Sequence, residues 1–128
     1  MNLHEKKGRR VGHICQLMLM SRDGTLKDSC HSFVSLEDHI GNDLYQQYPV
    51  LESLKPLLEK LQPLGLPLSL PAVHFSLGGR RGVYDFEFWV DDENPSQLEW
   101  LVFDQTERYN HLQRIQQQRN ELLVNLQN

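Results

Sequence analysis

Runs of apolar residues predict two strands at the start of the chain. Residues 11–20 and residues 26–33 are both rich in bulky side chains, as strands are. Asp23-Gly24 lies between the two runs, and an Asp-Gly pair in that position is a strong signal for a tight hairpin turn. We therefore expect the domain to begin with an antiparallel hairpin.

The residues that follow carry the pattern of short helices. Ser35, with Asp38 three positions later, has the spacing of a helix N-cap, and Gly41 is expected to end that turn. Residues 42–49 predict a second short turn of helix, because Pro49 stops it from continuing.

An apolar stripe with three- and four-residue spacing predicts an amphipathic helix over residues 51–61. The stripe consists of Leu51, Leu54, Leu57, Leu58 and Leu61. Pro56 lies inside this stretch, so the pattern fits either one helix or two short ones. The leucines of the stripe are expected in the core.

Three further strands are predicted before the last helix. Pro67 and Pro71 restrict any strand in residues 64–76 to the edge of a sheet, or to a start after Pro71. Residues 83–90 alternate, which places Tyr84, Phe86 and Phe88 on one face, and residues 98–103 form the last strand. Two strands, short helices, three strands and one helix indicate an α+β protein with an antiparallel sheet.

The end of the chain predicts one long helix with an apolar seam. Asp104 and Thr106 are good N-cap residues, and no Gly or Pro follows them. The seam has the spacing of heptad positions a and d, and consists of Arg108, Leu112, Ile115, Arg119, Leu122 and Leu126. An isolated helix of this length is marginal in water, which favours a partner helix. Packing of these side chains on their own domain is the alternative, because the repeat is shorter than most coiled coils.

Composition limits the classes of function. The 128 residues suit one domain with an appendage. The net charge of −4 argues against a nucleic-acid partner, since such proteins need a basic face, and the basic residues 6–10 are expected in a solvated arm. Two cysteines do not make a disulfide framework, and neither a membrane span nor a signal peptide is evident. We expect a cytoplasmic protein without a membrane partner.

Residues capable of metal chemistry have simpler interpretations. The predicted hairpin brings two pairs of zinc-ligand types together, His13 with Cys15 and Cys30 with His31. Cys30 and His31 point to opposite faces of a strand, so core or surface roles are favoured. No metal site is predicted.

No catalytic motif stands out either, and no catalytic residue is predicted. Residues 78–82 can cradle an anion or form a tight turn with two solvated arginines, and the turn is favoured. Asp85 and Glu87 share one strand face, where a solvated surface is favoured over a paired-carboxylate site.

The order of these elements, together with four short passages, resembles the PAS sensor-domain family. Residues 17–26 resemble the family's first two strands with their Asp-Gly turn, and residues 35–44 resemble the passage after them. Three closing strands end in residues 100–107. Within these, Asp104-Gln105-Thr106 matches the Asp-x-Thr motif where the family's last strand enters a signalling helix, and the residues from Tyr109 onward resemble that helix.

The resemblance implies a five-stranded antiparallel sheet with short helices on one face, a possible small-molecule pocket between them, and a homodimer. The implied organisation is a flexible basic arm over residues 1–10, a sensor domain over 11–106 and a signalling or coiled-coil helix over 107–128. The implied function is a sensory or dimerisation module of a bacterial-type signal-transduction protein, without catalysis. Its helix relays a ligand or partner signal to an effector domain or partner such as a kinase or cyclase, so the chain is a stand-alone module or the first part of a longer protein.

Three groups of residues follow from this interpretation. Asp104 and Thr106 are the expected relay between sheet and helix. The expected dimer interface consists of Leu112, Ile115, Leu122 and Leu126. The candidate ligand pocket is lined by Leu54, Leu58, Val73, Phe75, Phe86, Phe88 and Trp100.

The cofactor stays unknown. Neither Cys15 nor Cys30 lies in the Asn-Cys-Arg-Phe passage of the family's flavin photosensors, and residues 51–61 lack the histidine of its haem-binding members. Two alternatives remain: a small α+β ligand-binding protein or enzyme with a cavity between sheet and helices, and a purely structural dimeriser with a filled core.

Overall fold

A single antiparallel sheet organises the chain in the computed structural model, which describes residues 15–32 and 34–127. Its strand order is β2-β1-β5-β4-β3, and every neighbouring pair is antiparallel. The strands are β1 (Gln16–Ser21), β2 (Leu26–Ser29), β3 (Leu68–Leu77), β4 (Arg80–Val90) and β5 (Gln97–Asp104). Short helices and one long terminal helix complete an α+β fold, which confirms the predicted class.

The opening hairpin turns at Asp23-Gly24, as predicted. Gly24 has a φ of +96°, and a Cβ at this position would lie 2.3 Å from the ring of Tyr45, so both the turn and the packing require glycine. The second strand ends at Ser29, earlier than predicted, because His31 adopts a φ of 56° that breaks the extended chain. The predicted arm and the first part of the predicted first strand, residues 1–14, lie outside the described residues.

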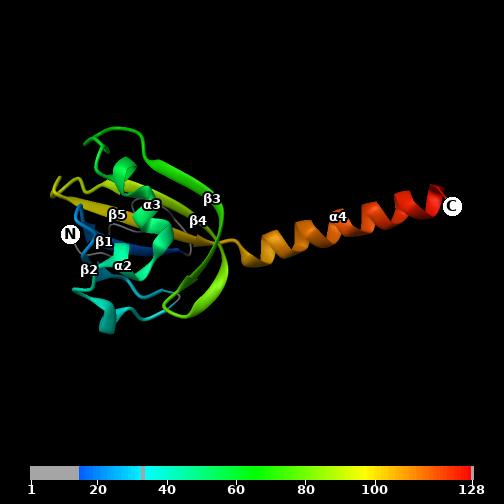
Figure 1. Ribbon diagram of the computed structural model, residues 1–128, viewed down its shortest axis with the longest axis horizontal. Coiled ribbons are helices and arrows are strands. Elements are labelled where there is room, and N and C mark those ends of the chain that lie inside the picture. The colour runs from blue at the N-terminus through cyan, green and yellow to red at the C-terminus, as the bar shows by residue number, and fades with distance from the viewer. Residues whose placement is uncertain (1–14, 33, 128) are drawn as a thin grey trace.

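Three helical elements follow β2. They are η1 (Glu37–His39), α2 (Leu44–Gln47) and α3 (Pro49–Leu58), and Figure 1 shows α2 and α3 over one face of the sheet. The predicted cap by Ser35 is wrong, since η1 is a single 3-10 turn that follows Leu36 and has no side-chain cap. Burial of Leu36, whose N–H donates to His31 Nδ1 at 2.9 Å, fixes the entry to this turn instead.

Four of the five leucines of the stripe lie in one helix, α3, rather than in two. The predicted extension to residue 61 is wrong, because α3 ends at Leu58 and Leu61 lies beyond it. Pro56 lies inside α3, while Pro49 occupies its first turn, where a missing N–H costs nothing. Leu51, Leu54 and Leu58 are buried as predicted. Leu57 is 51% exposed, so the stripe that faces the sheet is narrower than the sequence indicates.

The prolines predict the place of β3 correctly. β3 is an edge strand that pairs only with β4, and its register shifts between Leu70 and Val73. Pro71 lies at this irregularity, where the absence of a backbone donor is tolerated. The hairpin to β4 turns at Gly78 and Gly79, which have φ values of 54° and 86°.

An aromatic cluster fills the space between the sheet and α3. Trp100, on the central strand β5, is fully buried. Its ring centroid lies 5.2 Å from that of Phe86, 5.8 Å from that of Phe88 and 6.1 Å from that of Phe75. Aromatic side chains bury large apolar areas, so this cluster is the main packing contribution to the core.

The opposite face of β1 and β5 carries a second apolar cluster. Its buried members are Cys15, Leu17, Cys30 and Leu101. Neither cysteine is part of a disulfide bond among the described residues. His31 was also considered as a zinc ligand in the sequence analysis. Its side chain is exposed, and its Nδ1 accepts a hydrogen bond from Leu36 N. His13 lies outside the described residues.

One arginine connects three parts of the fold. Arg22, in the first hairpin, donates from Nη2 to Leu61 O at 3.1 Å and from Nε to Pro95 O at 3.1 Å. Its Nη1 lies within 3.4 Å of two further carbonyl oxygens near the end of α3. The charge of the guanidinium suits the carbonyls at a helix C-terminus, where the helix dipole is negative.

We expect Arg22→Ala to lower the free energy of unfolding by roughly 1–3 kcal/mol, since hydrogen bonds from a charged group contribute more than neutral ones. Chemical denaturation measures the change. Lys60→Ala, which removes an exposed positive charge nearby, is the control and should change stability little. Equal effects of the two substitutions would show that Arg22 does not hold these segments together.

Candidate functional site: the joint between sheet and terminal helix

The terminal helix leaves the central strand of the sheet almost directly. Only Gln105 separates β5 from α4 (Thr106–Gln127), and the helix begins one residue before the predicted boundary at 107. Figure 1 shows α4 extending away from the sheet with its C-terminal end far from the domain. The candidate site is therefore the short joint between β5 and the helix.

The two residues predicted as the relay contact each other at this joint. Asp104 Oδ1 accepts hydrogen bonds from the backbone N–H of Thr106 at 3.0 Å and from its Oγ1 at 2.6 Å. The carboxylate therefore satisfies a donor of the first helical turn, as capping side chains do.

Thr106 also connects the helix to β4. Its Oγ1 accepts a hydrogen bond from Val83 N at 3.0 Å, and Gln105 N donates to Val83 O at 2.8 Å. Gly82 leaves room for this arrangement, since a Cβ there would lie 2.5 Å from Thr106 Oγ1. The joint thus holds the start of α4 against a neighbouring strand as well as against its own.

Gln105 extends the network to the edge strand. Its Nε2 donates to Asp85 Oδ2 at 3.1 Å, and Asp85 Oδ1 accepts from Ala72 N at 2.9 Å. Asp85 therefore has a structural role within the described residues. Glu87, its neighbour on the same face, accepts from Trp89 Nε1 at 2.6 Å.

The two arginines after the turn have different roles. Arg80 Nη2 forms an ion pair with Asp104 Oδ2 at 2.9 Å, whereas Arg81 lines a separate groove described below. Burial raises the pKa of Asp104, but hydrogen bonds from Thr106 and the guanidinium of Arg80 outweigh it and leave the pKa below its ordinary value. Burial raises the pKa of Tyr84, whose hydroxyl donates to Arg80 O at 2.8 Å.

The predicted interface residues lie on the exposed part of α4. Exposed fractions are 54% for Leu112, 39% for Ile115, 63% for Leu122 and 83% for Leu126. They do not pack on their own domain, which was the alternative, and Leu123 adds a further exposed leucine beside them.

The seven candidate pocket residues gather between the sheet and α3, in the main core. Leu54, Leu58, Phe86, Phe88 and Trp100 are buried, while Val73 and Phe75 are partly buried and pack against them. Trp100 Nε1 is buried and has no hydrogen-bond partner among the described residues. A buried N–H without a partner is costly, so an acceptor on a small molecule is one way to satisfy it. Whether these residues hold a ligand stays a prediction.

The structure assembles an acidic cluster that sequence reasoning missed. One oxygen each from Asp91, Asp92 and Glu99 lies within 4.8 Å of the others, and Asp91 and Glu99 are buried. Carboxylate oxygens are the ligands that Ca²⁺ and Mg²⁺ prefer, so these described residues have the chemistry to hold a metal ion. Glu99 lies on β5, and the turn between β4 and β5 brings it close to the two aspartates. The spacing of these residues in the sequence does not predict this contact.

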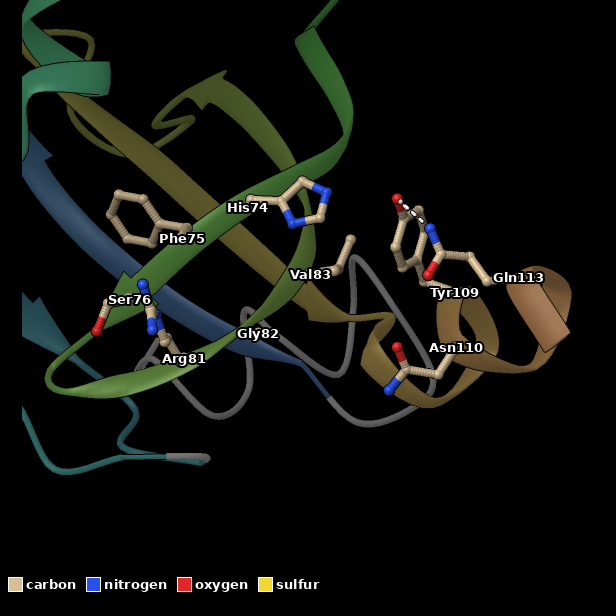
Figure 2. Close-up of a pocket in the computed structure, with 9 residues that line it drawn as sticks. All are labelled: His74, Phe75, Ser76, Arg81, Gly82, Val83, Tyr109, Asn110 and Gln113. Atoms are coloured by element: carbon tan, nitrogen blue, oxygen red, sulfur yellow. Dashed lines mark hydrogen bonds between the residues drawn. The ribbon is translucent and has the colours of Figure 1, made fainter. Parts of the chain in front are cut away.

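A groove lies beside the joint (Figure 2). It has a volume of about 610 Å³ and lies between the β3–β4 hairpin and the first turns of α4. Its lining is His74, Phe75, Ser76, Arg81, Gly82, Val83, Tyr109, Asn110 and Gln113. Sequence reasoning missed the groove because it depends on the angle at which α4 leaves the sheet.

None of the described helices is both long and apolar enough to cross a membrane.

Comparison of the chain with models of known protein families gives no match, and neither does comparison with curated proteins.

We expect Thr106→Ala to lower the free energy of unfolding by about 1–2 kcal/mol, because Val83 N–H and Asp104 both lose a partner. Chemical denaturation gives this value. Thr106→Ser keeps the hydroxyl and should retain most of the stability. A serine variant as unstable as the alanine variant would mean that the hydrogen bonds of the joint contribute nothing.

The joint should also weaken in acid. The pKa of Asp104 is lowered in the folded protein, so its carboxylate contributes stability above the ordinary value of 3.8, and this contribution is lost as the pH falls through the lowered pKa. The wild type should therefore have a higher Tm than Asp104→Asn at about pH 6, and the difference should shrink toward about pH 2. A difference in Tm that is independent of pH would contradict this assignment.

Proposed function

We propose that the protein is a sensory and dimerisation module of PAS type, without catalytic activity, whose terminal helix relays a signal to an effector. The observation that carries the proposal is the joint of Asp104 and Thr106, through which the central strand passes into a projecting helix. Residues 104–106 have the Asp-x-Thr pattern of the PAS resemblance.

The relay would begin at β5. This strand pairs with β1 on one side and with β4 on the other, and Trp100 projects from it into the aromatic core. A change of packing around Trp100 would shift β5, and the hydrogen bonds of Thr106 would carry the shift to the helix. The sheet and the helix would therefore move together.

The output of this relay would be a pair of helices from two copies of the chain. The seam residues of α4 are exposed, and their four- and three-residue spacing is that of coiled-coil positions a and d. A second copy presents the same stripe, so the interface would be self-complementary, as in most symmetric dimers. An effector domain or partner such as a kinase or cyclase would respond to a change in the helix pair.

The signal would be a small molecule or a partner protein. The aromatic core supports a small molecule, because Trp100 Nε1 is a buried donor without a partner among the described residues. The net charge of −4 supports partners other than nucleic acid. The proposed location is cytoplasmic.

An enzyme with a cavity between sheet and helices is the second candidate, and the same Trp100 donor favours it. An enzyme needs convergent acids, bases or nucleophiles in such a cavity. The buried carboxylate of β5, Glu99, belongs to the opposite face of the strand from Trp100, since neighbouring residues alternate. This arrangement supports the non-catalytic proposal.

The dimer is tested by placing a charge in the seam. We expect Leu122→Lys to weaken self-association by at least about tenfold, because each copy loses a buried apolar side chain and gains a charge. Light scattering of the full chain over a range of concentrations measures the association.

Gln117→Lys adds the same charge on the opposite side of α4 and is the matched control, so it should leave association unchanged. A version of the chain that ends at Thr106 should be monomeric. A wild-type chain that stays monomeric at high concentration would refute the helix pairing.

A further inference from the structure

The groove beside the joint is lined by hydrogen-bond donors from two separate elements. Figure 2 shows Ser76 and Arg81 on the β3–β4 hairpin and Asn110 and Gln113 on α4. Ser76 and Arg81 are cross-strand partners, so their side chains share a face. The guanidinium, the hydroxyl and the amides are all hydrogen-bond donors. Figure 2 places Ser76 and Arg81 beside each other at the hairpin end of the groove, and Asn110 and Gln113 at its helix end.

The electrostatic character of the groove differs from that of the whole chain. The chain has a net charge of −4, yet within the described part of the chain Arg81 and His74 line the groove and no carboxylate does. Among the residues that the structure describes, none forms an ion pair or hydrogen bond with the Arg81 side chain. Its neighbour Arg80 is different, because it pairs with Asp104. The groove thus holds a cation with a free donor fork in an otherwise acidic protein.

An aromatic pair forms another part of the groove. The rings of His74, on β3, and Tyr109, on α4, pack edge to face with centroids 5.2 Å apart. The Tyr109 hydroxyl accepts a hydrogen bond from Gln113 Nε2 at 3.0 Å, which fixes the amide against the ring. A volume of about 610 Å³ is in the range of sites that bind small organic molecules.

We propose that this groove binds a small organic anion, a carboxylate or a phosphate, with Arg81 as its principal contact. Guanidinium groups match the geometry of both anions because their N–H donors form a planar fork. Ser76, beside Arg81, adds a hydrogen bond to the anion, and the organic part of the ligand extends past Val83 toward the His74–Tyr109 pair and Asn110.

A ligand in this position would contact the hairpin and the helix at once. It would therefore hold the first turns of α4 against β4, next to the hydrogen bond from Val83 to Thr106. Binding of the anion is independent of helix pairing, whereas its use as a signal rests on the proposed function. Phe75 belongs to both the groove and the aromatic core around Trp100, whereas Arg81 lines the groove alone, so a substitution of Arg81 tests the groove without changing the core.

Benzoate and inorganic phosphate are suitable probes, titrated into the full-length chain and followed by backbone amide chemical shifts. We expect at least one of them to shift the amides of His74, Arg81 and Tyr109 at concentrations up to about 10 mM, the affinity range of a small weak ligand. Shifts with benzoate alone would assign a carboxylate ligand, and shifts with phosphate alone would assign a phosphate ligand.

Arg81→Gln should weaken binding of the active probe by at least about tenfold, since a hydrogen bond from a charged group contributes that much. Arg114→Gln removes the same charge from an exposed position of α4 outside the groove, and should bind as the wild type does. Asn110→Ala, at an exposed helical position, should weaken binding less than the arginine substitution.

Leu122→Lys lies outside the groove and should bind the probe normally, so loss of pairing and loss of binding are measured independently. The proposal is overturned if neither probe shifts the groove amides, or if Arg81→Gln and Arg114→Gln bind equally well.

Discussion

The position of β5 in the middle of the sheet is the constraint on which the rest of the structure depends. The strand is bonded on both sides, to β1 and to β4, and it carries apolar residues on both faces. A slip of one residue would exchange Trp100 and Leu101 between the aromatic core and the second cluster, which differ in size and shape. Pairing with β1, pairing with β4 and the different packing on its two faces therefore fix the register of β5. The residue at which α4 begins is fixed with it.

The hydrogen bonds of Thr106, rather than the ion pair, make the joint rigid. The side chains of Arg80 and Asp104 are 48% and 21% exposed, and ion pairs with that access to water contribute little. Thr106 instead receives the N–H of Val83 and donates to Asp104, and a Cβ at Gly82 would collide with it. A rotation of the helix would break these bonds, which supports the proposal that the helix and the sheet move together.

Short sequence patterns predicted the structure correctly where residues close together in the sequence determine it. Asp23-Gly24 predicts the first hairpin, Pro71 predicts an edge strand, and the alternation of residues 83–90 predicts which aromatic residues are buried. They failed where distant residues decide. Ser35 does not cap η1, because the burial of Leu36 fixes the start of that turn. Arg22 contacts carbonyl oxygens that lie 36 to 73 residues away in the sequence. The Asp104–Thr106 contact could be predicted because both residues lie in one motif, whereas the groove needs the angle between hairpin and helix, which no local pattern contains.

In the proposed dimer, weak pairing of the terminal helices would suit a role in signalling. Arg119 occupies a core position of the seam, and polar residues at such positions reduce coiled-coil stability. Coupling between two sites of a protein is typically about 1–3 kcal/mol, so a ligand can shift an association only when the association is itself marginal. A seam made wholly of leucine would hold two helices together whatever the state of the sheet. In the proposed dimer, a short seam that is interrupted by Arg119 and joined to the central strand would open or close in response to a small change in the domain.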